Sequence, residues 1–531
     1  MKKLFYIFAL VAFTLLSCND NEVDINNNAI NESSTGLLIK KVRKLENPYT
    51  VSNMKKAYSA LQQEGLMKAP LNIEATHLYV RFLPKDSAEL ETMFGDTTLT
   101  LFSYPLDYEL TEGEKYIDST LIGNDFTWLY TRVPVGYTSP ISQYEVIEQL
   151  YLPTLIESEI QGVKRQEVSS NISNDWWDIL ENKSFELTGN SNSAQKINSS
   201  QTIQKASNRW TPKATIRVRD NITNTYVPLQ GVEVRARWWF NWEKGFTDVN
   251  GKATMSGSFS GKLNWSIVWD SHDWDIRSGF YGQAYYNGPD GSKSDWNLDI
   301  GIGGKSFVYG HIHRACYNYW NNNLGLKKPF IDNFWKQKIK IAVYGKAGRS
   351  YFGSGWRWLF GSPVAIYELE SDGNPRSSAR IYNTTIQEIA HVSHWEMDNS
   401  DFYKADDRVV ESYSVGIAYV FSAQVYSAGQ IPHGDFQDVS FEKYTAPASD
   451  YGYESKYTAL VIDLMDNYNQ RAVWGINRPV DNVSGYTIEQ IENAIKGAKT
   501  LEKWRDNLRD KYDNPTENNL DELFNNYINW R

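Results

Sequence analysis

One segment near the C-terminus most strongly constrains the fold. Residues 408–429 read RVVESYSVGIAYVFSAQVYSAG, and Glu411 is the only Asp, Glu, Lys or Arg from Val409 to Gly434. A helix that is apolar on nearly all sides must be buried against several neighbours. A lone carboxylate in such a helix is costly to bury without a cation, hydrogen bonds or access to the surface. The segment therefore predicts a large helical core and a partner for Glu411.

The length and charge of the chain limit the remaining possibilities. At 531 residues it is too long for one core, and roughly three domains of about 100–200 residues are expected. Its formal net charge of -10 gives no electrostatic reason to bind nucleic acid or an anionic membrane surface. We therefore expect a multidomain protein with no nucleic-acid partner.

Residues 1–17 are predicted to be a signal peptide. Lys2 and Lys3 precede an apolar run, 4–16, that is too short for a permanent membrane span. The run ends in Leu-Leu-Ser-Cys, which resembles the lipobox of bacterial lipoproteins. That resemblance implies cleavage before Cys18 and lipidation of this residue, with palmitate among its acyl chains. The alternative is an ordinary secreted protein with an unmodified Cys18.

Residues 18–35 are polar, Asn-rich and acidic, which predicts a disordered, lipid-anchored tether. The acidic run also resembles a surface-export signal of some Gram-negative lipoproteins. We expect attachment to the bacterial outer membrane, facing the periplasm or the cell surface, through the lipid alone. Once Cys18 is acylated, Cys316 has no partner for an internal disulfide.

Residues 36–165 mix helical and strand patterns and predict an N-terminal α/β module. A helix is expected over 47–65, with Thr50 or Ser52 as its cap. Its apolar face is formed by Met54, Ala57 and Leu61. Strands are expected over 76–84 and 97–110. The module resembles one shared by a group of bacterial surface lipoproteins.

Residues 166–209 are predicted to be a linker, because the segment from residue 188 on is rich in Ser, Asn and Gln.

Residues 210–300 predict an all-β domain. Two segments, 215–220 and 231–238, alternate between apolar and charged residues, and Asn250-Gly251 marks a turn. The residues expected to face inward are Ile216, Val218, Val232, Val234 and Ala236, and those expected to face outward are Arg217, Arg219, Glu233, Arg235 and Arg237. The V-P-L-x-G-V-x-V and T-D-x-N-G patterns, at 227–234 and 247–251, resemble the carboxypeptidase regulatory-like β-sandwich, which is immunoglobulin-like.

Tryptophans are concentrated in this segment. WWFNW at 238–242, with Trp265, Trp269 and Trp274, forms either a sugar-stacking surface or the core and rim of a small sandwich. The first interpretation makes a glycan a possible partner.

Residues 305–531 predict a mainly helical domain. Helices are expected at 384–395, 408–429 and 457–470. A capping box at Thr487 and Gln490 marks the start of a further helix, which is expected to end before Gly497. Two amphipathic helices close the chain. The predicted fold class is thus multidomain α+β, with an N-terminal α/β module, a β-sandwich and a helical C-terminal domain.

The segment TTIQEIAHVSHW, residues 384–395, carries the candidate site. Positions i and i+4 of a helix point the same way, so Gln387 and His391 can reach one metal ion. Glu388 stands where a zinc peptidase needs its general base. A further ligand must come from another helix, and Glu411 follows His391 by 20 residues.

This arrangement, over roughly residues 305–480, resembles the thermolysin-like gluzincins, which have the zincin fold. The resemblance implies zinc as the cofactor, His391 and Glu411 as ligands, Glu388 as the catalytic base and a peptide or protein as the substrate. Gln387 departs from the pattern, because an amide oxygen is a weak zinc ligand. The domain is then either a weakly active peptidase or a pseudoenzyme that binds peptide.

Other residues are weaker candidates. His394 is a possible replacement ligand, and His433, Tyr451 or Tyr453 a possible electrophile. Asp463 either holds the imidazole of His391 or makes a packing hydrogen bond. His311 and His313 alternate like strand residues and are expected to be structural.

Each principal residue also has a structural explanation. Glu388 could cap its helix with Thr385, His391 could be a hydrogen-bonded core histidine, and Glu411 could pair with His391 or an arginine without metal. A non-enzymatic adhesin that uses the Trp-rich sandwich is the alternative function, and a purely structural envelope protein is a third.

Overall fold

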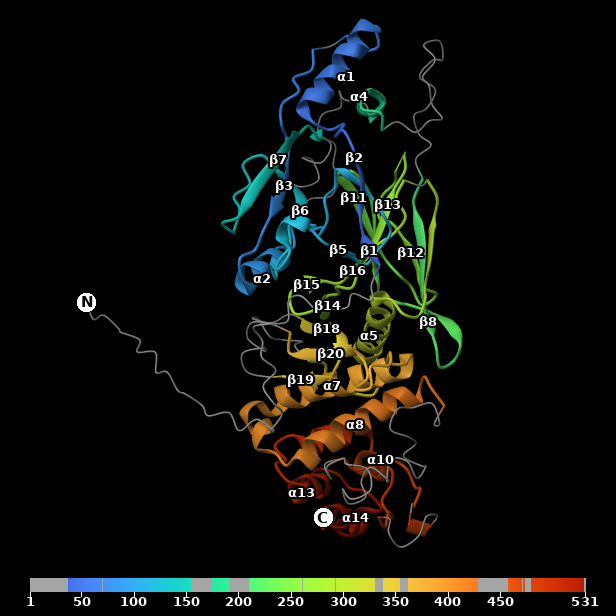
Figure 1. Ribbon diagram of the computed structural model, residues 1–531. Helices are drawn as coiled ribbons and strands as arrows, with labels where there is room; N and C mark the ends of the chain where they lie inside the picture. The colour runs from blue at the N-terminus through green and yellow to red at the C-terminus, as the bar shows by residue number, and fades with distance from the viewer. Residues whose placement is uncertain are drawn as a thin grey trace, which may run out of the picture.

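The computed structural model describes residues 37–68, 70–153, 174–190, 210–259, 261–291, 293–329, 338–353, 362–427, 457–469, 471–472 and 479–529. These residues form an elongated, mixed α+β protein, with the N-terminal module at one end and the C-terminal helices at the other (Figure 1). The predicted signal peptide and tether with Cys18, and also His433, Tyr451 and Tyr453, lie outside the described residues. No helix within the described ranges has both the length and the apolar character needed to cross a membrane.

Helix α1 (Val51–Gln63) is close to its predicted position. The hydroxyl of Thr50 accepts a hydrogen bond from the Asn53 backbone at 3.1 Å, so Thr50 is the N-cap. Met54, Ala57 and Leu61 are buried, as their spacing predicts. Local capping and periodicity were therefore sufficient to place this helix.

The strands of the N-terminal module are antiparallel except for one short pair. Its main sheet has the order β6 (Leu129–Pro134), β3 (His77–Phe82), β7 (Tyr144–Leu150). Strand β1 (Leu38–Ile39) pairs in parallel with β5 (Lys115–Tyr116). Strand β2 (Lys41–Lys44) pairs with β4 (Tyr108–Leu110) in antiparallel orientation. The module also contains the helix α2 (Ser87–Gly95) and the 3-10 turn η1 (Ser119–Leu121). Only the end of the strand expected over 97–110 is therefore a strand.

Helix α4 (Asn174–Leu187) lies within the predicted linker and corrects that prediction. It packs on α1, with Leu180 and Phe185 buried in the core of the module. The Tyr49 hydroxyl donates to Glu181 at 2.6 Å. The Ser- and Asn-rich composition of the flanking residues obscured a short amphipathic helix that packs on α1 and on neighbouring aromatic residues.

The middle segment contains two four-stranded sheets that share one core. The first has the order β11 (Asn241–Phe246), β10 (Glu233–Trp238), β13 (Asn264–Val268), β16 (Tyr285–Asn287). In the second, β8 (Lys213–Asp220) pairs with β12 (Lys252–Thr254), β9 (Thr225–Pro228) and β17 (Trp296–Ile300). Ile216 and Val218 of β8 face the core as predicted. Trp265 of the first sheet contacts Trp296 of the second, with a distance of 5.9 Å between their ring centroids.

The outer face of β10 is not exposed, contrary to the prediction for Arg235 and Arg237. These side chains are buried because the N-terminal module covers them. Arg235 Nη1 donates to the Leu101 carbonyl at 3.1 Å, and Arg237 Nη1 to the Trp239 carbonyl at 3.0 Å. Charged alternation in the sequence could not show that a second domain satisfies these guanidinium groups.

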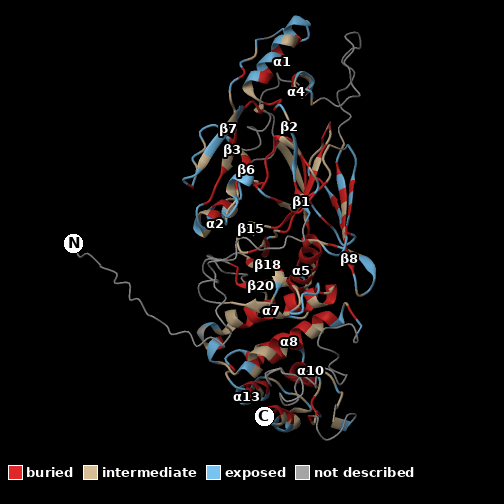
Figure 2. Ribbon diagram, viewed as in Figure 1, coloured by how far each residue is buried: buried red, intermediate tan, exposed pale blue. Residues whose placement is uncertain are grey.

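The tryptophans of this segment belong to cores. Trp239 belongs to the core of the N-terminal module, whereas Trp265, Trp269 and Trp274 belong to the central core. Figure 2 shows buried segments both in the N-terminal module and in the middle of the molecule. Buried indoles cannot stack on a sugar. The core interpretation therefore accounts for these four residues.

A five-stranded sheet follows, in a region that the sequence predicted to be mainly helical. Its order is β15 (Gly282–Gln283), β14 (Trp274–Ser278), β18 (Ile339–Ala347), β20 (Val364–Leu369), β19 (Tyr351–Phe352). β14, β18 and β20 are parallel, and the two edge strands are antiparallel. β14 and β15 lie within residues 210–300 but pair outside the sandwich. Parallel strands are joined by long crossovers and leave no hairpin signal in the sequence.

Helices complete the C-terminal part. They are α5 (Lys305–Trp320), α7 (Ser378–Asp398), α8 (Asp407–Ala423), α10 (Leu460–Met465), α12 (Ile488–Ile495), α13 (Leu501–Lys511) and α14 (Leu520–Ile528), with 3-10 turns η2 (Asn399–Lys404) and η4 (Glu517–Asn519). Of these helices, α5 and α7 contact the sheet. The capping box of Thr487 and Gln490 opens α12 as predicted. His311 and His313 lie on α5, so the expected strand there is wrong.

Candidate functional site

The least buried side of α7 is defined by the relative exposure of its side chains. From Ser378 to His394 only Arg380 and Gln387 are half-buried, and all other residues are buried. The next most exposed are Thr384 and His391 at 7% and Glu388 at 5%. These five residues recur at helical spacing and so lie on one side of the helix. We call them the α7 stripe.

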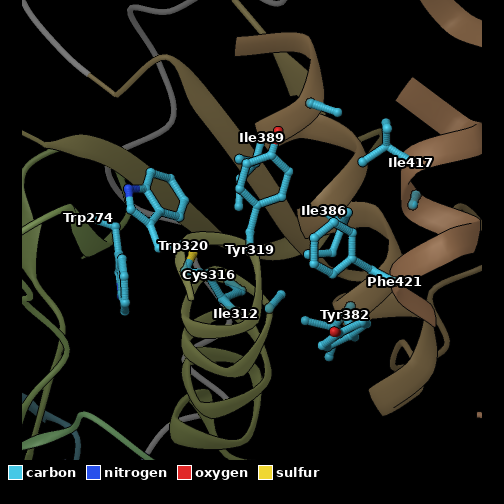
Figure 3. Packing of buried hydrophobic residues seen from close by; sticks show 14 of the residues in the cluster. Trp274, Ile312, Cys316, Tyr319, Trp320, Tyr382, Ile386, Ile389, Ile417 and Phe421 are labelled. Carbon is cyan, nitrogen blue, oxygen red and sulfur yellow. The ribbon is translucent and has the colours of Figure 1, made fainter. Parts of the chain in front are cut away.

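The opposite face of α7 holds the helix in place. Tyr382, Ile386 and Ile389 pack against α5 and α8, where Tyr319 stacks on Phe421 at a ring distance of 5.3 Å (Figure 3). This apolar packing directs the α7 stripe away from the core.

The start of α7 is held by the middle segment. Asp220, at the end of β8, accepts a hydrogen bond from the Ser378 hydroxyl at 2.7 Å and one from Arg314 at 2.8 Å. The sandwich strand β8 therefore fixes the helix that carries the site.

Two of the predicted site residues meet across the α7–α8 contact. His391 Nε2 lies 3.4 Å from Glu411 Oε2, and the two side chains are 9% and 20% exposed. This contact accounts for the single carboxylate in the apolar helix. By itself it fits either an ion pair or two ligands of one metal ion.

Glu388 does not cap its helix. α7 begins at Ser378, and Ser377 is the N-cap, accepting from the Arg380 backbone at 3.2 Å. Thr385 is in the helix interior, where its hydroxyl donates to the Ile381 carbonyl at 2.7 Å. The capping explanation for Glu388 is therefore wrong.

The carboxyl group of Glu388 is strongly perturbed by its surroundings. Burial raises its pKa to about 7, and the charge of Glu411 acts in the same direction. His391, Arg376 and a hydrogen bond from the Phe352 backbone oppose the rise. A carboxyl group with a pKa near neutrality can both accept and release a proton at physiological pH.

The donor atoms suit a zinc ion in part. Two ligands of a tetrahedral zinc, each about 2.1 Å from the ion, are about 3.3 Å apart, close to the 3.4 Å between His391 and Glu411. In the described part of the chain, no three His, Cys, Asp or Glu residues form a metal-binding group. Gln387, one turn before His391 on the same stripe, is the remaining candidate for a third donor.

His394 is directed elsewhere. Its Nε2 lies 3.3 Å from Asp398, and its ring packs edge-on against Phe402 and Tyr413, at 5.0 and 5.5 Å. The contacts with Asp398, Phe402 and Tyr413 account for the burial of His394 without a metal ion.

The other predicted residues have packing roles. The Tyr527 hydroxyl donates to Asp463, which links α14 to α10 and matches the packing alternative for Asp463. His311 and His313 hydrogen-bond the carbonyls of Arg219 and Gln230 at 3.1 and 2.8 Å. Burial lowers the pKa of both histidines to about 4, so they are neutral and structural.

Two residues near the site escaped the sequence analysis. Burial raises the pKa of Tyr457, the charges of Glu411 and Glu388 raise it further, and Arg349 and Arg380 oppose them. The phenol of Tyr457 therefore interacts electrostatically with both carboxylates. It is the first residue of the predicted helix 457–470, and nothing in its local pattern distinguishes it.

Arg376 is the second missed residue. Its guanidinium donates to Ser350 Oγ and the Gly348 carbonyl, both at 2.8 Å, and its charge lowers the pKa of Glu388. It precedes the twelve-residue motif, so the motif could not include it.

A scan against protein-family models found no match for this chain, and a search of curated proteins found none. The geometry of the site therefore carries the functional argument.

Proposed function

We propose that this chain is a bacterial surface lipoprotein whose C-terminal part is a gluzincin-like zinc peptidase with a weakened metal site. One observation carries the proposal. His391 and Glu411 converge from two helices, on the least buried side of α7, which also carries Glu388. An ion pair alone would explain the first two residues but not a third, buried carboxyl group beside them.

His391, Glu411 and the amide oxygen of Gln387 would hold the zinc ion. When bound, zinc supplies a Lewis acid that polarises a carbonyl group and acidifies water. Glu388 takes a proton from the attacking water and returns it to the leaving amine, a role that its pKa of about 7 supports. The charges of Glu411 and Glu388 both raise the pKa of Tyr457, which makes its phenol a candidate hydrogen-bond donor to a substrate at this site.

The sheet edge next to Glu388 supports a peptide substrate. β19 is the last strand of its sheet, and the Phe352 backbone contacts Glu388. No strand within the described ranges pairs with its outer edge. An extended peptide can add to a sheet edge by main-chain hydrogen bonds, and here the Phe352 N–H, which donates to Glu388, would have to change its partner. A peptide bound there would pass the carboxyl group that acts on it.

Gln387 explains why we propose weak rather than full activity. A neutral amide oxygen binds zinc less tightly than an imidazole nitrogen. The site then has two good ligands in place of three, and weak catalysis is expected at physiological zinc. A pseudoenzyme that retains only peptide binding is the other outcome of the test below.

The remaining parts of the proposal concern attachment. Cys18 would carry the lipid, the tether would span 18–35, and the central sheets would be a carboxypeptidase regulatory-like sandwich that supports α7 through Asp220. Cys18→Ser should move the chain from the membrane fraction to the soluble fraction. An adhesin that binds glycan through tryptophan has no support from the buried indoles.

Metal content and peptide cleavage together test the function. The whole chain and its Gln387→His variant are dialysed against trace zinc, and zinc is measured by mass spectrometry. Cleavage of a random peptide library is followed by mass spectrometry, with Glu388→Gln as the catalytic control. Zinc in both proteins and cleavage that is lost in Glu388→Gln support the proposal. Zinc only in Gln387→His favours the pseudoenzyme, and zinc in neither excludes the metal site.

A further inference from the structure

A polar cavity lies in the N-terminal module, apart from the proposed zinc site. Its walls come from the connection between β2 and α1, from the first turn of α1, and from β7, the outer strand of its sheet (Figure 1). The volume of the cavity is about 470 Å³. Sites for small organic molecules have volumes of about 300–1,000 Å³, whereas one water molecule occupies about 30 Å³. The cavity is therefore large enough for a small organic ligand.

The lining of this cavity is mostly polar. Its polar residues are Lys44, Glu46, Asn47, Thr50, Asn53 and Glu148. Backbone contacts hold the walls together: the Tyr151 N–H donates to the Tyr49 carbonyl at 2.9 Å, and Thr50 forms an antiparallel bridge with Leu150 at the end of β7. The walls are therefore fixed by the fold of the module, which lowers the cost of ordering them around a ligand.

Two buried amides orient the carboxylates of the cavity. Asn53 Nδ2 donates to Glu46 Oε1 at 3.1 Å, and Asn47 Nδ2 donates to Glu148 Oε2. Asn47 and Asn53 are only 3% and 7% exposed, so these donors are held in place by packing. Among the described residues, none donates to the other oxygen of either carboxylate. Each carboxylate is thus positioned by the protein and keeps an oxygen for a ligand.

The polar atoms of the two amides are occupied within the protein. Asn53 Nδ2 also donates to the Asn47 carbonyl at 2.9 Å. Asn47 Oδ1 accepts from the Tyr49 N–H at 2.9 Å, and Asn53 Oδ1 accepts from Lys56 Nζ at 3.1 Å. The carboxylates are therefore the principal groups that the cavity offers, and an ionised carboxylate only accepts hydrogen bonds. A ligand that matches them must be a donor.

The charges around the cavity favour a cationic donor. Glu46 and Glu148 lie in the lining together with Lys44, and Lys44 Nζ lies 3.6 Å from Asp107 Oδ2. Lys56, which donates to Asn53, is a second cation outside the lining. These groups are three carboxylates and two ammonium groups, so one negative charge remains in excess.

Glu148 is the carboxylate that a cation would stabilise most. Burial raises its pKa, and the charge of Asp107 acts in the same direction, whereas the hydrogen bond from Asn47 and the charge of Lys44 oppose the rise. The partial positive charge at the N-terminus of α1 also favours ionised carboxylates. A cation bound beside Glu148 would lower the cost of burying its charge.

We propose that this cavity binds a primary alkylammonium group through Glu46 and Glu148. An ammonium group has three N–H donors, and two of them would meet the two carboxylates in charge-assisted hydrogen bonds. The remaining volume accommodates the chain that carries the ammonium group. That group belongs either to a small diamine or to the lysine side chain of a peptide. This site goes beyond the proposed peptidase function and requires no zinc.

Isothermal titration calorimetry of the whole chain tests the site. Putrescine is the first probe, and 1,4-butanediol, which has the same carbon chain and no charge, is its control. Nα-acetyl-lysine amide and Nα-acetyl-norleucine amide form a second pair, which separates the lysine side chain from the free diamine. Calcium chloride is titrated alone, because carboxylates are also the ligands that this ion prefers.

We expect putrescine or the lysine derivative to bind, and neither uncharged control to bind. Glu46→Gln and Glu148→Gln should each weaken binding by about tenfold, because a charge-assisted hydrogen bond becomes a neutral one. Lys44→Gln should strengthen binding by up to about fivefold, because it removes a like charge from the lining. Glu145→Gln, on the same strand as Glu148, removes a carboxylate that pairs with Arg81 at 2.6 Å and should leave the affinity unchanged.

The opposite effects of Lys44→Gln and Glu148→Gln separate charge recognition from a folding defect, which would weaken binding in either variant. Equal binding of putrescine and 1,4-butanediol would assign the cavity to a neutral ligand and overturn the proposal. Binding that survives both glutamate substitutions, binding of calcium without either ammonium probe, or no binding of any probe would also overturn it. None of these results bears on the proposed zinc site, which metal content and peptide cleavage test separately.

Discussion

His391 Nε2 lies 3.4 Å from Glu411 Oε2, although one residue is carried by α7 and the other by α8. The imidazole gives the Glu411 carboxylate a polar partner, which lowers the cost of placing a charge within an apolar stretch of helix. The contact also places an imidazole and a carboxylate on the same side of α7 as Glu388 and Gln387. Packing of α7 on α8, rather than either helix alone, therefore creates the candidate site.

Removal of the Glu411 charge should weaken zinc binding. In the Gln387→His background, Glu411→Gln replaces a charged ligand with a neutral amide, and we expect at least a hundredfold loss of zinc affinity by calorimetry. Glu522→Gln, an exposed change on α14, is the matched control and should bind zinc normally. Equal affinity in all three proteins would exclude Glu411 as a ligand.

Glu492 should make the protein less stable as the pH rises. Burial raises its pKa from an ordinary 4.5 to about 7, although Tyr413 and the Lys327 backbone donate hydrogen bonds to it at 2.7 and 2.8 Å. The native state therefore binds its proton more tightly than the unfolded state. The stability that this group contributes is full below pH 4.5 and is lost as the pH rises through about 7.

Glu492→Gln removes this dependence because an amide has no charge to bury. The difference in free energy of unfolding between Glu492→Gln and the native chain should therefore grow, in favour of the variant, as the pH rises from 4.5 to 8. Its upper limit is about 3 kcal/mol, because each unit of pKa shift corresponds to about 1.4 kcal/mol. Thermal denaturation at several pH values measures the change. The exposed Glu522→Gln should follow the native curve, and a parallel curve for Glu492→Gln would contradict the prediction.

The two buried histidines of α5 should have the opposite pH dependence. Burial lowers the pKa of His311 and His313 from an ordinary 6.5 to about 4. Their contribution to stability is present above pH 6.5 and is lost as the pH falls through about 4. His313→Gln preserves a donor toward the Gln230 carbonyl. Between pH 6.5 and pH 4, this variant should lose up to about 3 kcal/mol less free energy of unfolding than the native chain.

Thermal melting from pH 7 to pH 4 checks this prediction. His272 has a side chain that is 90% exposed, so His272→Gln is the control and should leave the acid limb unchanged. If the melting temperature of His313→Gln fell with pH as steeply as that of the native chain, other groups would be the cause of the destabilisation in acid.

Glu114 should stabilise a helix that belongs to another part of the chain. Its carboxylate accepts from the backbone of Lys305 at 3.0 Å and of Ser306 at 2.5 Å, so it caps α5 from the N-terminal module. Glu114→Ala leaves these donors without that acceptor, at a cost of about 1–2 kcal/mol. Hydrogen exchange at the start of α5 should accelerate by about tenfold, whereas the exposed Glu109→Ala should not change it.

Much of the local structure was predictable because its causes lie within a few residues. Thr50 and Thr487 cap their helices through donors three positions away. The alternation of Ile216 and Val218 on β8 follows from the two-residue repeat of a strand. The helical spacing of Gln387, Glu388 and His391 likewise placed them on one side of a helix before any tertiary contact was considered.

Contacts between distant segments were not predictable in this way. β14 pairs with β18 across the whole of α5, so the sheet beneath the site cannot be recognised from either strand alone. Arg235 is buried because the N-terminal module covers it. The side of α7 that carries the stripe is set by the packing of α5 and α8 against its other side, which the helix's own sequence does not show.

The sequence by itself determined the helices and strands that local hydrogen bonds and side-chain periodicity specify, together with the candidate residues of the motif. Tertiary structure decided that Glu388 is not a cap, that His391 meets Glu411, and that His394 lies against Asp398. The reason is physical: a repeat assigns side chains to a face, but the neighbour against which that face packs comes from chain segments far away in the sequence.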